Sequence, residues 1–201
     1  MTATDDAAGE ARLVVTGERV GLGPLRGDLV PRYQRWANDL QVSRGLGMRQ
    51  VMTEEAERSW YEEFSKQDPG RVSFTIYDLD DLAPVGTTSL FEIDHYNGTA
   101  TFGIMVAERR GRGFGTEATR LMLEWGFTVL GLYNIELRVW DWNAGAIRAY
   151  TKAGFRETGR RRGGVVVMGR RYDIVYMDAI APEFKSSTLT DLVPEGGQPL
   201  A

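Results

Sequence analysis

The segment from Arg109 to Ala118 has the residue types and the spacing to bind a phosphate group. It is written Arg-Arg-Gly-Arg-Gly-Phe-Gly-Thr-Glu-Ala, and its three alternating glycines let backbone N–H groups approach a ligand without hindrance from side chains. An apolar run precedes it, and an amphipathic helical pattern, Thr116 to Leu130, follows it. The first N–H groups of a helix lack intrahelical acceptors and carry the positive end of its dipole. The segment therefore predicts a socket for a phosphate-bearing ligand.

Other phosphate-binding loops fit this segment less well. A P-loop would close with Gly-Lys-Ser/Thr, whereas Gly115 is followed directly by Thr116. A dinucleotide fingerprint is matched by Gly113, Gly115 and Ala118, but it requires a βαβ unit, and the strand before this loop belongs to an antiparallel meander. A strand–helix turn that binds nothing remains an alternative on these residues alone.

The elements around the loop form a mixed α/β pattern. Hydrophobic periodicity predicts strands at 13–25, 72–79, 85–93, 99–106, 135–139, 165–168 and 172–180. It predicts helices at 29–39, 53–67, 116–130 and 143–153. Thr53 and Asn143 stand at the N-cap positions of two of these helices, and Gly154 closes the last one. These elements must position the loop and any side chain that acts beside it.

Composition restricts the class of protein. The 201 residues suit one α/β domain, which we place at 12–184, between a disordered segment at 1–11 and a mobile tail at 185–201. Because there is no cysteine, disulfides, thiolate metal sites and a cysteine nucleophile are excluded, and we expect no metal. The net charge of −4 argues against a nucleic-acid partner. With no long apolar run and no signal-peptide pattern, we expect a cytoplasmic protein without a membrane partner.

Further motifs follow the loop in a fixed order. The loop itself provides Arg110-x-x-Gly113-x-Gly115 and Thr116-Glu-Ala118, and the later motifs are Val139-x-x-x-Asn143, Ala146-Ile-x-x-Tyr150-x-x-x-Gly154-Phe155, Arg171-Tyr-Asp173…Met177 and Glu183-Phe184. In these motifs the chain resembles the GCN5-related N-acetyltransferases (GNATs), in the group similar to ribosomal-protein and spermidine acetyltransferases. The resemblance covers roughly residues 12–184.

The resemblance implies a fold and a cosubstrate. The fold would be a single α/β (α+β) domain with a mixed, mostly antiparallel sheet of about seven strands, flanked by helices and splayed at the coenzyme site. The cosubstrate would be acetyl-CoA, with its pantetheine arm on the backbone of residues 104–106 and its pyrophosphate on the N–H groups of residues 111–116. A homodimer is also compatible with the family. The implied coenzyme-binding residues are Ile104, Met105, Val106, Arg109, Arg110, Gly111, Arg112, Gly113, Phe114, Gly115, Thr116, Asn143, Ile147 and Tyr150.

Acetyl transfer to an amine has three chemical requirements. The amine must lose a proton before it can attack, the tetrahedral oxyanion needs a hydrogen-bond donor, and a proton assists the departing thiolate. The family resemblance implies direct attack by the amine and places the phenol of Tyr150 near the coenzyme sulfur as the general acid. Asn143 lies two helical turns before Tyr150, on the same face. It suits both an N-cap and a contact to the pantetheine arm.

The general base is less sharply defined by the sequence. Glu92 is the carboxylate that the resemblance favours, acting directly or through a water, although an exposed strand residue would look the same. Asp94 continues the face of Glu92 along the strand. His95, the only histidine, falls in a hairpin turn. Related enzymes often have an acidic residue at the position of Thr101, on the predicted strand 99–106. Because this chain has a threonine there, the case for a general base on the strand 99–106 is weaker.

The acceptor is predicted from residues 29–67, which usually form the acceptor wall in this family. Aromatic residues and several acids in this segment suit a cationic amine such as a polyamine or an amino sugar, with Glu92 and Asp94 at the reacting end. The aromatic residues are Tyr33, Trp36 and Trp60. Core packing would explain the same aromatics. A protein N-terminus as the acceptor, and a module that binds acyl-CoA without catalysis, stay open as alternatives.

Overall fold

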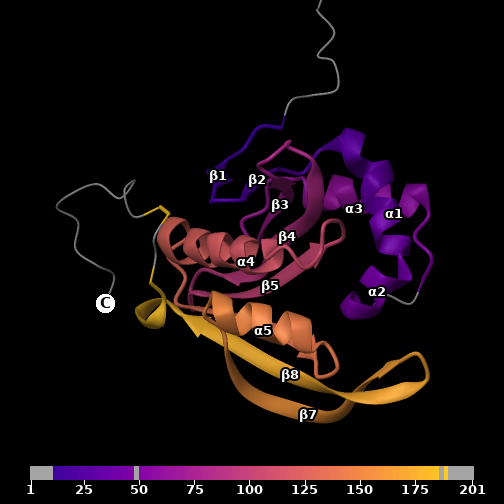
Figure 1. The fold of residues 1–201 in the computed structure, drawn as a ribbon. Helices are drawn as coiled ribbons and strands as arrows, with labels where there is room; N and C mark the ends of the chain where they lie inside the picture. The colour runs from indigo at the N-terminus through magenta and orange to yellow at the C-terminus, as the bar shows by residue number, and fades with distance from the viewer. Residues whose placement is uncertain (1–10, 48–49, 186–187, 190–201) are drawn as a thin grey trace, which may run out of the picture.

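The protein is built on one mixed sheet with helices packed against it (Figure 1). This computed structural model describes residues 11–47, 50–185 and 188–189, so the predicted terminal segments 1–11 and 185–201 lie almost entirely outside the described residues. The described strands are β1 (Val15–Thr16), β2 (Val20–Pro24), β3 (Arg71–Asp78), β4 (Pro84–Asp94), β5 (Thr99–Val106), β6 (Asn134–Trp140), β7 (Arg156–Val167) and β8 (Arg170–Ile180). The described helices are α1 (Val30–Asn38), α2 (Leu40–Leu46), α3 (Glu54–Phe64), α4 (Phe114–Glu124) and α5 (Ala144–Ala153).

The sheet order is β1-β2-β3-β4-β5-β6-β8-β7, and every neighbouring pair is antiparallel except β5 and β6. This confirms the predicted mixed, mostly antiparallel sheet. The described part contains one strand more than expected because the segment 13–25 folds back on itself. The turn closes with the N–H of Gly17 donating to the carbonyl of Val20 (2.8 Å), and the short β1 then pairs with β2.

The strands β5 and β6 separate partway along their length. They pair in parallel only between Thr99–Thr101 and Asn134–Glu136, yet β5 continues to Val106 and β6 to Trp140. Beyond Thr101 the edge of β5 that faces β6 therefore has no strand partner, although its other edge stays paired with β4 as far as Val106. The predicted splayed pair is confirmed, and it begins next to Gly103 without a bulge there.

Local side chains set the starts of two helices as predicted. The hydroxyl of Thr53 accepts a hydrogen bond from the N–H of Ala56 (3.1 Å) at the start of α3, and the Asn143 side chain accepts from Ala146 (3.2 Å) at the start of α5. The predicted helix 116–130 is helical as far as Val129, but its second half is not an α-helix. The α-helix ends at Glu124 and widens into a π-helical turn over Trp125–Val129, which leaves Val129 50% exposed.

The hairpin of β7 and β8 is longer than predicted. Residues 156–164, which the sequence pattern did not predict as a strand, also belong to β7. This strand forms the edge of the sheet, and most of its side chains are exposed on both faces. An edge strand of this kind lacks the apolar alternation by which strands are recognised.

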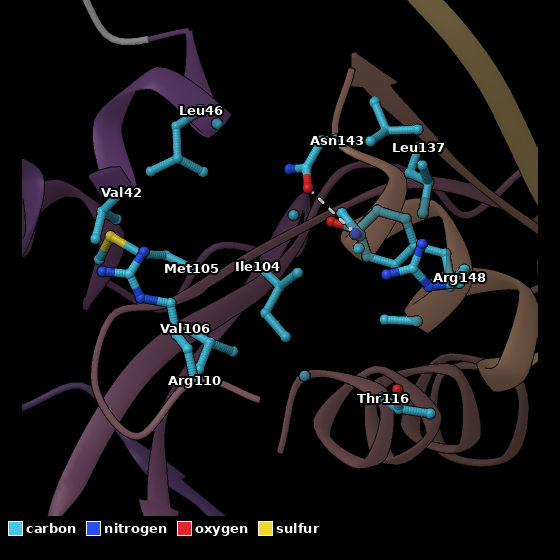
Figure 2. A pocket seen from close by; sticks show the side chains of 18 of the residues that line it. Val42, Leu46, Ile104, Met105, Val106, Arg110, Thr116, Leu137, Asn143 and Arg148 are labelled. Atoms are coloured by element: carbon cyan, nitrogen blue, oxygen red, sulfur yellow. Dashed lines mark hydrogen bonds between the residues drawn. The ribbon is translucent and has the colours of Figure 1, made fainter. Parts of the chain in front are cut away.

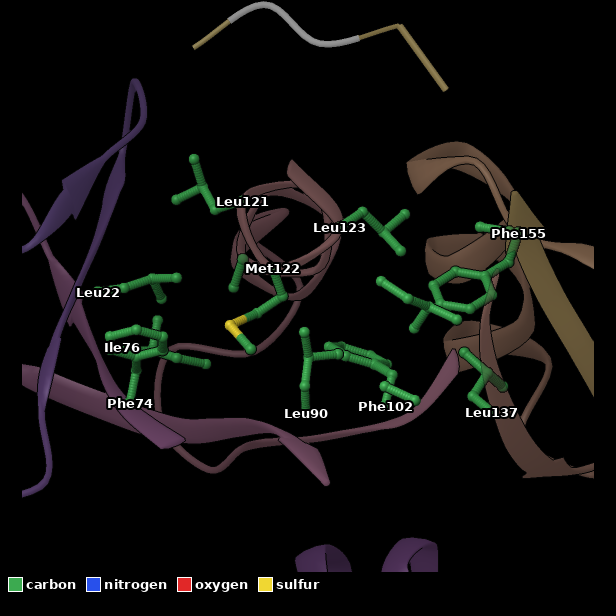
Figure 3. Close-up of a cluster of buried hydrophobic side chains, with 14 of the residues drawn as sticks. Leu22, Phe74, Ile76, Leu90, Phe102, Leu121, Met122, Leu123, Leu137 and Phe155 are labelled. Carbon is green, nitrogen blue, oxygen red and sulfur yellow. The ribbon is translucent and has the colours of Figure 1, made fainter. Parts of the chain in front are cut away.

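The main core lies between the sheet and α4 (Figure 3). Met122 and its neighbours on α4 pack on Phe74, Leu90 and Phe102, and Phe155 closes the cluster beside α5. The opposite face of the sheet is covered by α1 and α3: the hydroxyls of Tyr33 and Thr75 lie 2.5 Å apart. The opened end of the sheet therefore lies between two helical layers.

Candidate active site

A cavity of about 730 Å³ occupies the space opened between β5 and β6. Its walls are the free end of β5, the end of β6, the loop before α4, one side of α5 along most of its length, and α2. In Figure 2, Val42 and Leu46 of α2 face Leu137 and Asn143 across the cavity, with Ile104 between them. A volume of this size is within the range of ligand and cofactor pockets.

The glycine loop presents unpaired backbone donors to this cavity. Arg109, Gly111 and Gly113 alternate at positive φ (53°, 83° and 85°), which turns successive peptide groups toward one side. The N–H groups of residues 111–115 donate no hydrogen bond to any described residue, whereas Thr116 donates to the Gly113 carbonyl (3.1 Å). Five donors at the N-terminus of α4 therefore remain free for an anionic ligand.

The three loop arginines differ in their surroundings. Arg109 is ion-paired to Asp78 and Asp81, and Arg112 to Asp78 (3.1 Å) and Asp80 (3.2 Å). The Asp78 side chain is only 1% exposed. Burial alone would raise its pKa, but hydrogen bonds from Arg109 and from the backbone outweigh that effect, so the pKa lies below its usual range.

Arg110 is the loop arginine with the weakest contacts to other protein groups. It lines the cavity, and its guanidinium makes three long contacts, 3.3 Å to the Ala107 carbonyl, 3.4 Å to the Gln41 carbonyl and 3.4 Å to Asp39. Since Arg109 and Arg112 hold the loop to the turn after β3, they can stabilise its conformation whether or not a ligand is present.

The cavity gathers most of the predicted coenzyme residues: Ile104, Met105, Val106, Arg109, Arg110, Gly111, Gly113, Phe114, Gly115, Thr116, Asn143 and Tyr150. Two do not line it. The guanidinium of Arg112 turns to the aspartates described above, and Ile147 packs against the core because it lies on the inner face of α5. The structure therefore gives neither side chain a direct place in the cavity wall.

Tyr150 lies on α5 where the cavity meets the core. Its ring makes edge-to-face contacts with Phe102 (6.1 Å between centroids) and Phe155 (6.0 Å). Its hydroxyl has no hydrogen-bond partner among the described residues, and burial raises its pKa to about 12. At neutral pH the phenol is therefore fully protonated and free to donate.

Asn143 also borders the cavity, but its side-chain oxygen is already used. That oxygen caps α5 (Figure 2), which leaves its amide group as the part that can donate to a ligand. The structure thus brings Asn143 and Tyr150 to one cavity from the same helix.

The predicted base candidates on β4 lie outside the cavity wall. Glu92 is exposed at a bulge with a φ of 53°, and its carboxylate accepts a hydrogen bond from the Thr101 hydroxyl (2.8 Å). Thr101 does line the cavity, so Glu92 reaches it only through that hydroxyl. Asp94 instead accepts backbone N–H groups of the following turn, those of Tyr96 (2.9 Å) and Asn97 (3.0 Å).

Two predicted acceptor residues are packed in the core. Tyr33 is fully buried against Thr75, and Trp36 donates its indole N–H to Glu108 (2.8 Å). Neither borders the cavity between β5 and β6 or a second, smaller cavity beside α3. Their spacing on α1 reflects packing against α3 and the sheet, which sequence periodicity cannot distinguish from a ligand-facing stripe.

Sequence analysis missed two features of this region. The helix α2 supplies a wall of the main cavity, and its signals were present: Asp39 caps its first turn (2.7 Å to Gln41), and Gly47 ends it at a φ of 72°. Glu57 of α3 is buried beside the second cavity, and desolvation raises its pKa to about 7. No sequence pattern separates Glu57 from its exposed neighbours.

A substitution of Gly115 can test ligand binding at the loop before α4 without disturbing the fold. A methyl group at this position would meet only the side chain of Val106, at 3.6 Å, and would otherwise extend into the cavity that both residues line. Because the family resemblance implies acetyl-CoA in this cavity, we expect Gly115→Ala to weaken its binding about 10-fold, or about 1.4 kcal/mol, without lowering the melting temperature. Gly159→Ala is the matched control, because it also lies in open space but outside the cavity. Equal affinities of the two variants in calorimetry would contradict this placement of the ligand.

Two further properties concern the described residues only. None of their helices is long and apolar enough to cross a membrane. No group of three or more histidine, cysteine, aspartate or glutamate side chains among them is arranged to hold a metal ion.

Comparison with solved structures shows the fold. A spermidine N-acetyltransferase from Vibrio cholerae, solved in complex with CoA and spermine, superposes with a TM-score of 0.76 at 23% identity, over 82% of this chain and 97% of that one. A GNAT-family acetyltransferase from Bacillus anthracis gives 0.73 at 18% identity, over 84% and 99%.

Comparison with known sequences identifies the family of this chain. The human alpha/beta-tubulin-N-acetyltransferase 9 is 30% identical over 162 residues, which are 72% of this chain and 75% of that protein. The mouse protein of the same name is 28% identical over 160 residues, and this chain spans 64% of its length. The Escherichia coli spermidine N(1)-acetyltransferase is 41% identical over 75 residues, or 37% of this chain and 40% of that protein. The model of the acetyltransferase (GNAT) domain matches residues 19–156, and the chain therefore belongs to the GNAT family.

Proposed function

We propose that this protein transfers an acetyl group from acetyl-CoA directly to a primary amine that is cationic in solution. The observation that carries the proposal is the cavity between β5 and β6, which joins five free N–H donors at one end to the unpartnered phenol of Tyr150 in its wall. When bound there, the coenzyme would supply an activated acetyl group and a thiolate leaving group.

The residues of the cavity suit the parts of acetyl-CoA. The N–H groups of residues 111–115 and the Arg110 guanidinium would hold the pyrophosphate at the start of α4. The unpaired edge of β5 beyond Thr101 would bind the amide groups of the pantetheine arm as a neighbouring strand would. The amide group of Asn143 can donate to the same arm. The binding of CoA by the V. cholerae neighbour is consistent with this arrangement.

Tyr150 would protonate the departing sulfur. With a phenol pKa of about 12 and a thiol pKa of roughly 8.5, complete proton donation to a free thiolate would cost about 5 kcal/mol. We therefore propose that Tyr150 gives up its proton while it receives one from the acceptor nitrogen. The same hydroxyl would act as donor and acceptor, and no charged phenolate would accumulate in the apolar surroundings of Phe102 and Phe155.

The proposal is tested by thiol release from acetyl-CoA in the presence of a broad panel of amines. We expect saturable release with cationic primary amines and little with neutral or acidic ones. Binding of acetyl-CoA without thiol release from any amine would instead identify a non-catalytic acyl-CoA-binding module. Absence of acetyl-CoA binding would reject the proposal altogether.

A protein amine is the second candidate acceptor. The relatives named for tubulin N-acetylation align over about 160 residues, whereas those named for spermidine acetylation align over 75 residues. The panel should therefore contain short peptides with free N-termini beside spermidine and an amino sugar. The ratio of kcat/KM values between these classes decides between them.

A further inference from the structure

A second cavity, of about 240 Å³, lies on the other side of β5 from the core. Its walls come from α1, α3, β4 and β5. It shares Gly103, Ile104 and Met105 with the cavity between β5 and β6, and Leu46 and Phe91 also border both cavities. The two spaces therefore meet along the strand on which the acetyl-bearing arm would lie.

Glu57 is the single ionisable residue among the described residues that line this second cavity. The residue is 5% exposed, and its carboxylate makes no hydrogen bond or ion pair with any described residue. The other walls contribute apolar side chains, including the aromatic rings of Trp60, Phe64 and Phe91, and hydroxyls from β4. This carboxylate lines a cavity whose other described walls are apolar or hydroxyl-bearing, so no counter-charge is at hand, and a cation bound in the cavity would supply one.

We propose that this second cavity is the acceptor site, in which Glu57 binds the ammonium group of the acceptor and takes its first proton. This inference rests on the proposed acetyl transfer and extends it by naming the acceptor class. The single carboxylate would select a primary ammonium group, and the aromatic and aliphatic walls would select an apolar chain next to it. The reacting end of the acceptor would therefore be a primary ammonium on an apolar stem. The aromatic rings can add cation–π attraction.

The proton balance of the reaction is complete with this assignment. The carboxylate of Glu57 takes one proton from the ammonium, which frees the nitrogen lone pair. The nitrogen then forms its bond to the acetyl carbon, and the carbon–sulfur bond breaks. The second nitrogen proton passes to Tyr150 as the phenol proton goes to sulfur, and Glu57 returns its proton to solvent.

The environment of Glu57 suits this first step. Desolvation raises the pKa of Glu57 to about 7, whereas an alkylammonium resembles lysine, with a pKa of roughly 10.4. Proton transfer is therefore uphill by about three pKa units, against about six for an ordinary glutamate. No other described side chain that lines this cavity titrates, because α1, α2 and the segment before α3 contribute Ala37, Leu46 and Met52, and the strands contribute hydroxyl, apolar and glycine residues. The remaining lining residues of α3, Trp60 and Phe64, do not titrate either.

The experiment compares Glu57→Gln with Glu62→Gln, an exposed glutamate on the same helix that borders neither cavity. With 2-phenylethylamine as the acceptor at pH 7.5, we expect kcat/KM to fall at least about 100-fold in the first variant and less than twofold in the second. The wild-type protein should show an acidic limb in kcat/KM with an apparent pKa near 7, and this limb should vanish in Glu57→Gln. Acetyl-CoA affinity should be the same in all three proteins. The wild type should prefer 2-phenylethylamine to spermidine.

Each contrary result has a definite meaning. Equal kcat/KM in the two variants would overturn the inference, as would loss of acetyl-CoA binding in Glu57→Gln, because the residue would then be structural. Persistence of the acidic limb in Glu57→Gln and its loss in Glu92→Gln would assign the base to Glu92 instead. If the wild type releases no thiol with any amine, the proposed function fails. Calorimetry then tests the acceptor site separately, since only proteins that retain Glu57 should bind 2-phenylethylamine.

Discussion

Replacing Tyr150 with phenylalanine should lower kcat about 100-fold or more and leave the affinity for acetyl-CoA within about twofold. The ring would keep its edge-to-face contacts with Phe102 and Phe155, so packing should be preserved. The hydroxyl has no partner among the described residues, and its removal leaves no other group unsatisfied. The loss should therefore appear in the chemical step, measured as single-turnover thiol release.

Tyr96→Phe is the matched control, because this tyrosine is 96% exposed and remote from both cavities. It should retain wild-type kcat. If Tyr150→Phe kept full turnover, or if it lost acetyl-CoA binding in proportion to its turnover, Tyr150 would not be the proton donor.

Replacing Glu57 with glutamine should stabilise the protein at high pH. Burial favours the neutral carboxyl, so the pKa of Glu57 rises from 4.5 to about 7 on folding. The folded state then binds more protons than the unfolded state between these values, and wild-type stability falls as pH rises through that window. Because the carboxylate borders a cavity that solvent can enter, we expect a reduced effect of about 1–2 kcal/mol.

The measurement is the difference in unfolding free energy between Glu57→Gln and the wild type, taken from denaturant titrations at pH 4.5 and pH 8. The difference should be near zero at the lower pH and favour the variant at the higher one. Glu62→Gln should show no such change. A constant difference across this range would mean that Glu57 keeps an ordinary pKa, and the case for its isolation in the cavity would fail.

Many of the residues that line the cavity between β5 and β6 could be predicted because local chemistry specifies them. Alternating glycines between a strand and a helix make backbone donors accessible wherever they occur. Asn143 and Tyr150 share a helical face because they are seven residues apart, whatever that helix packs against. The splayed strands also followed from the family resemblance, and the structure has them.

Residues whose role depends on distant partners could not be predicted in this way. Arg109 and Arg112 were expected at the phosphates, and what the sequence did not indicate is that both also pair with Asp78, about thirty residues earlier in the chain. Tyr33 and Trp36 have the spacing of a ligand-facing stripe and are core residues. Whether a polar or aromatic side chain faces a cavity or a core depends on what packs over it.

The sequence by itself determined that this chain has a glycine-rich loop at a helix N-terminus, a capped helix that displays Asn143 and Tyr150 on one face, and a mixed α/β fold around them. Each of these depends on neighbours within a few residues, through turn geometry, helix periodicity and capping. Only the tertiary structure decided that α2 forms part of the wall of the cavity between β5 and β6, and that Glu92 reaches this cavity only through Thr101. It also decided that Glu57, alone among the acidic residues of α3, is buried. Burial and desolvation arise from contacts between distant segments, and identical residues therefore acquire different chemistry.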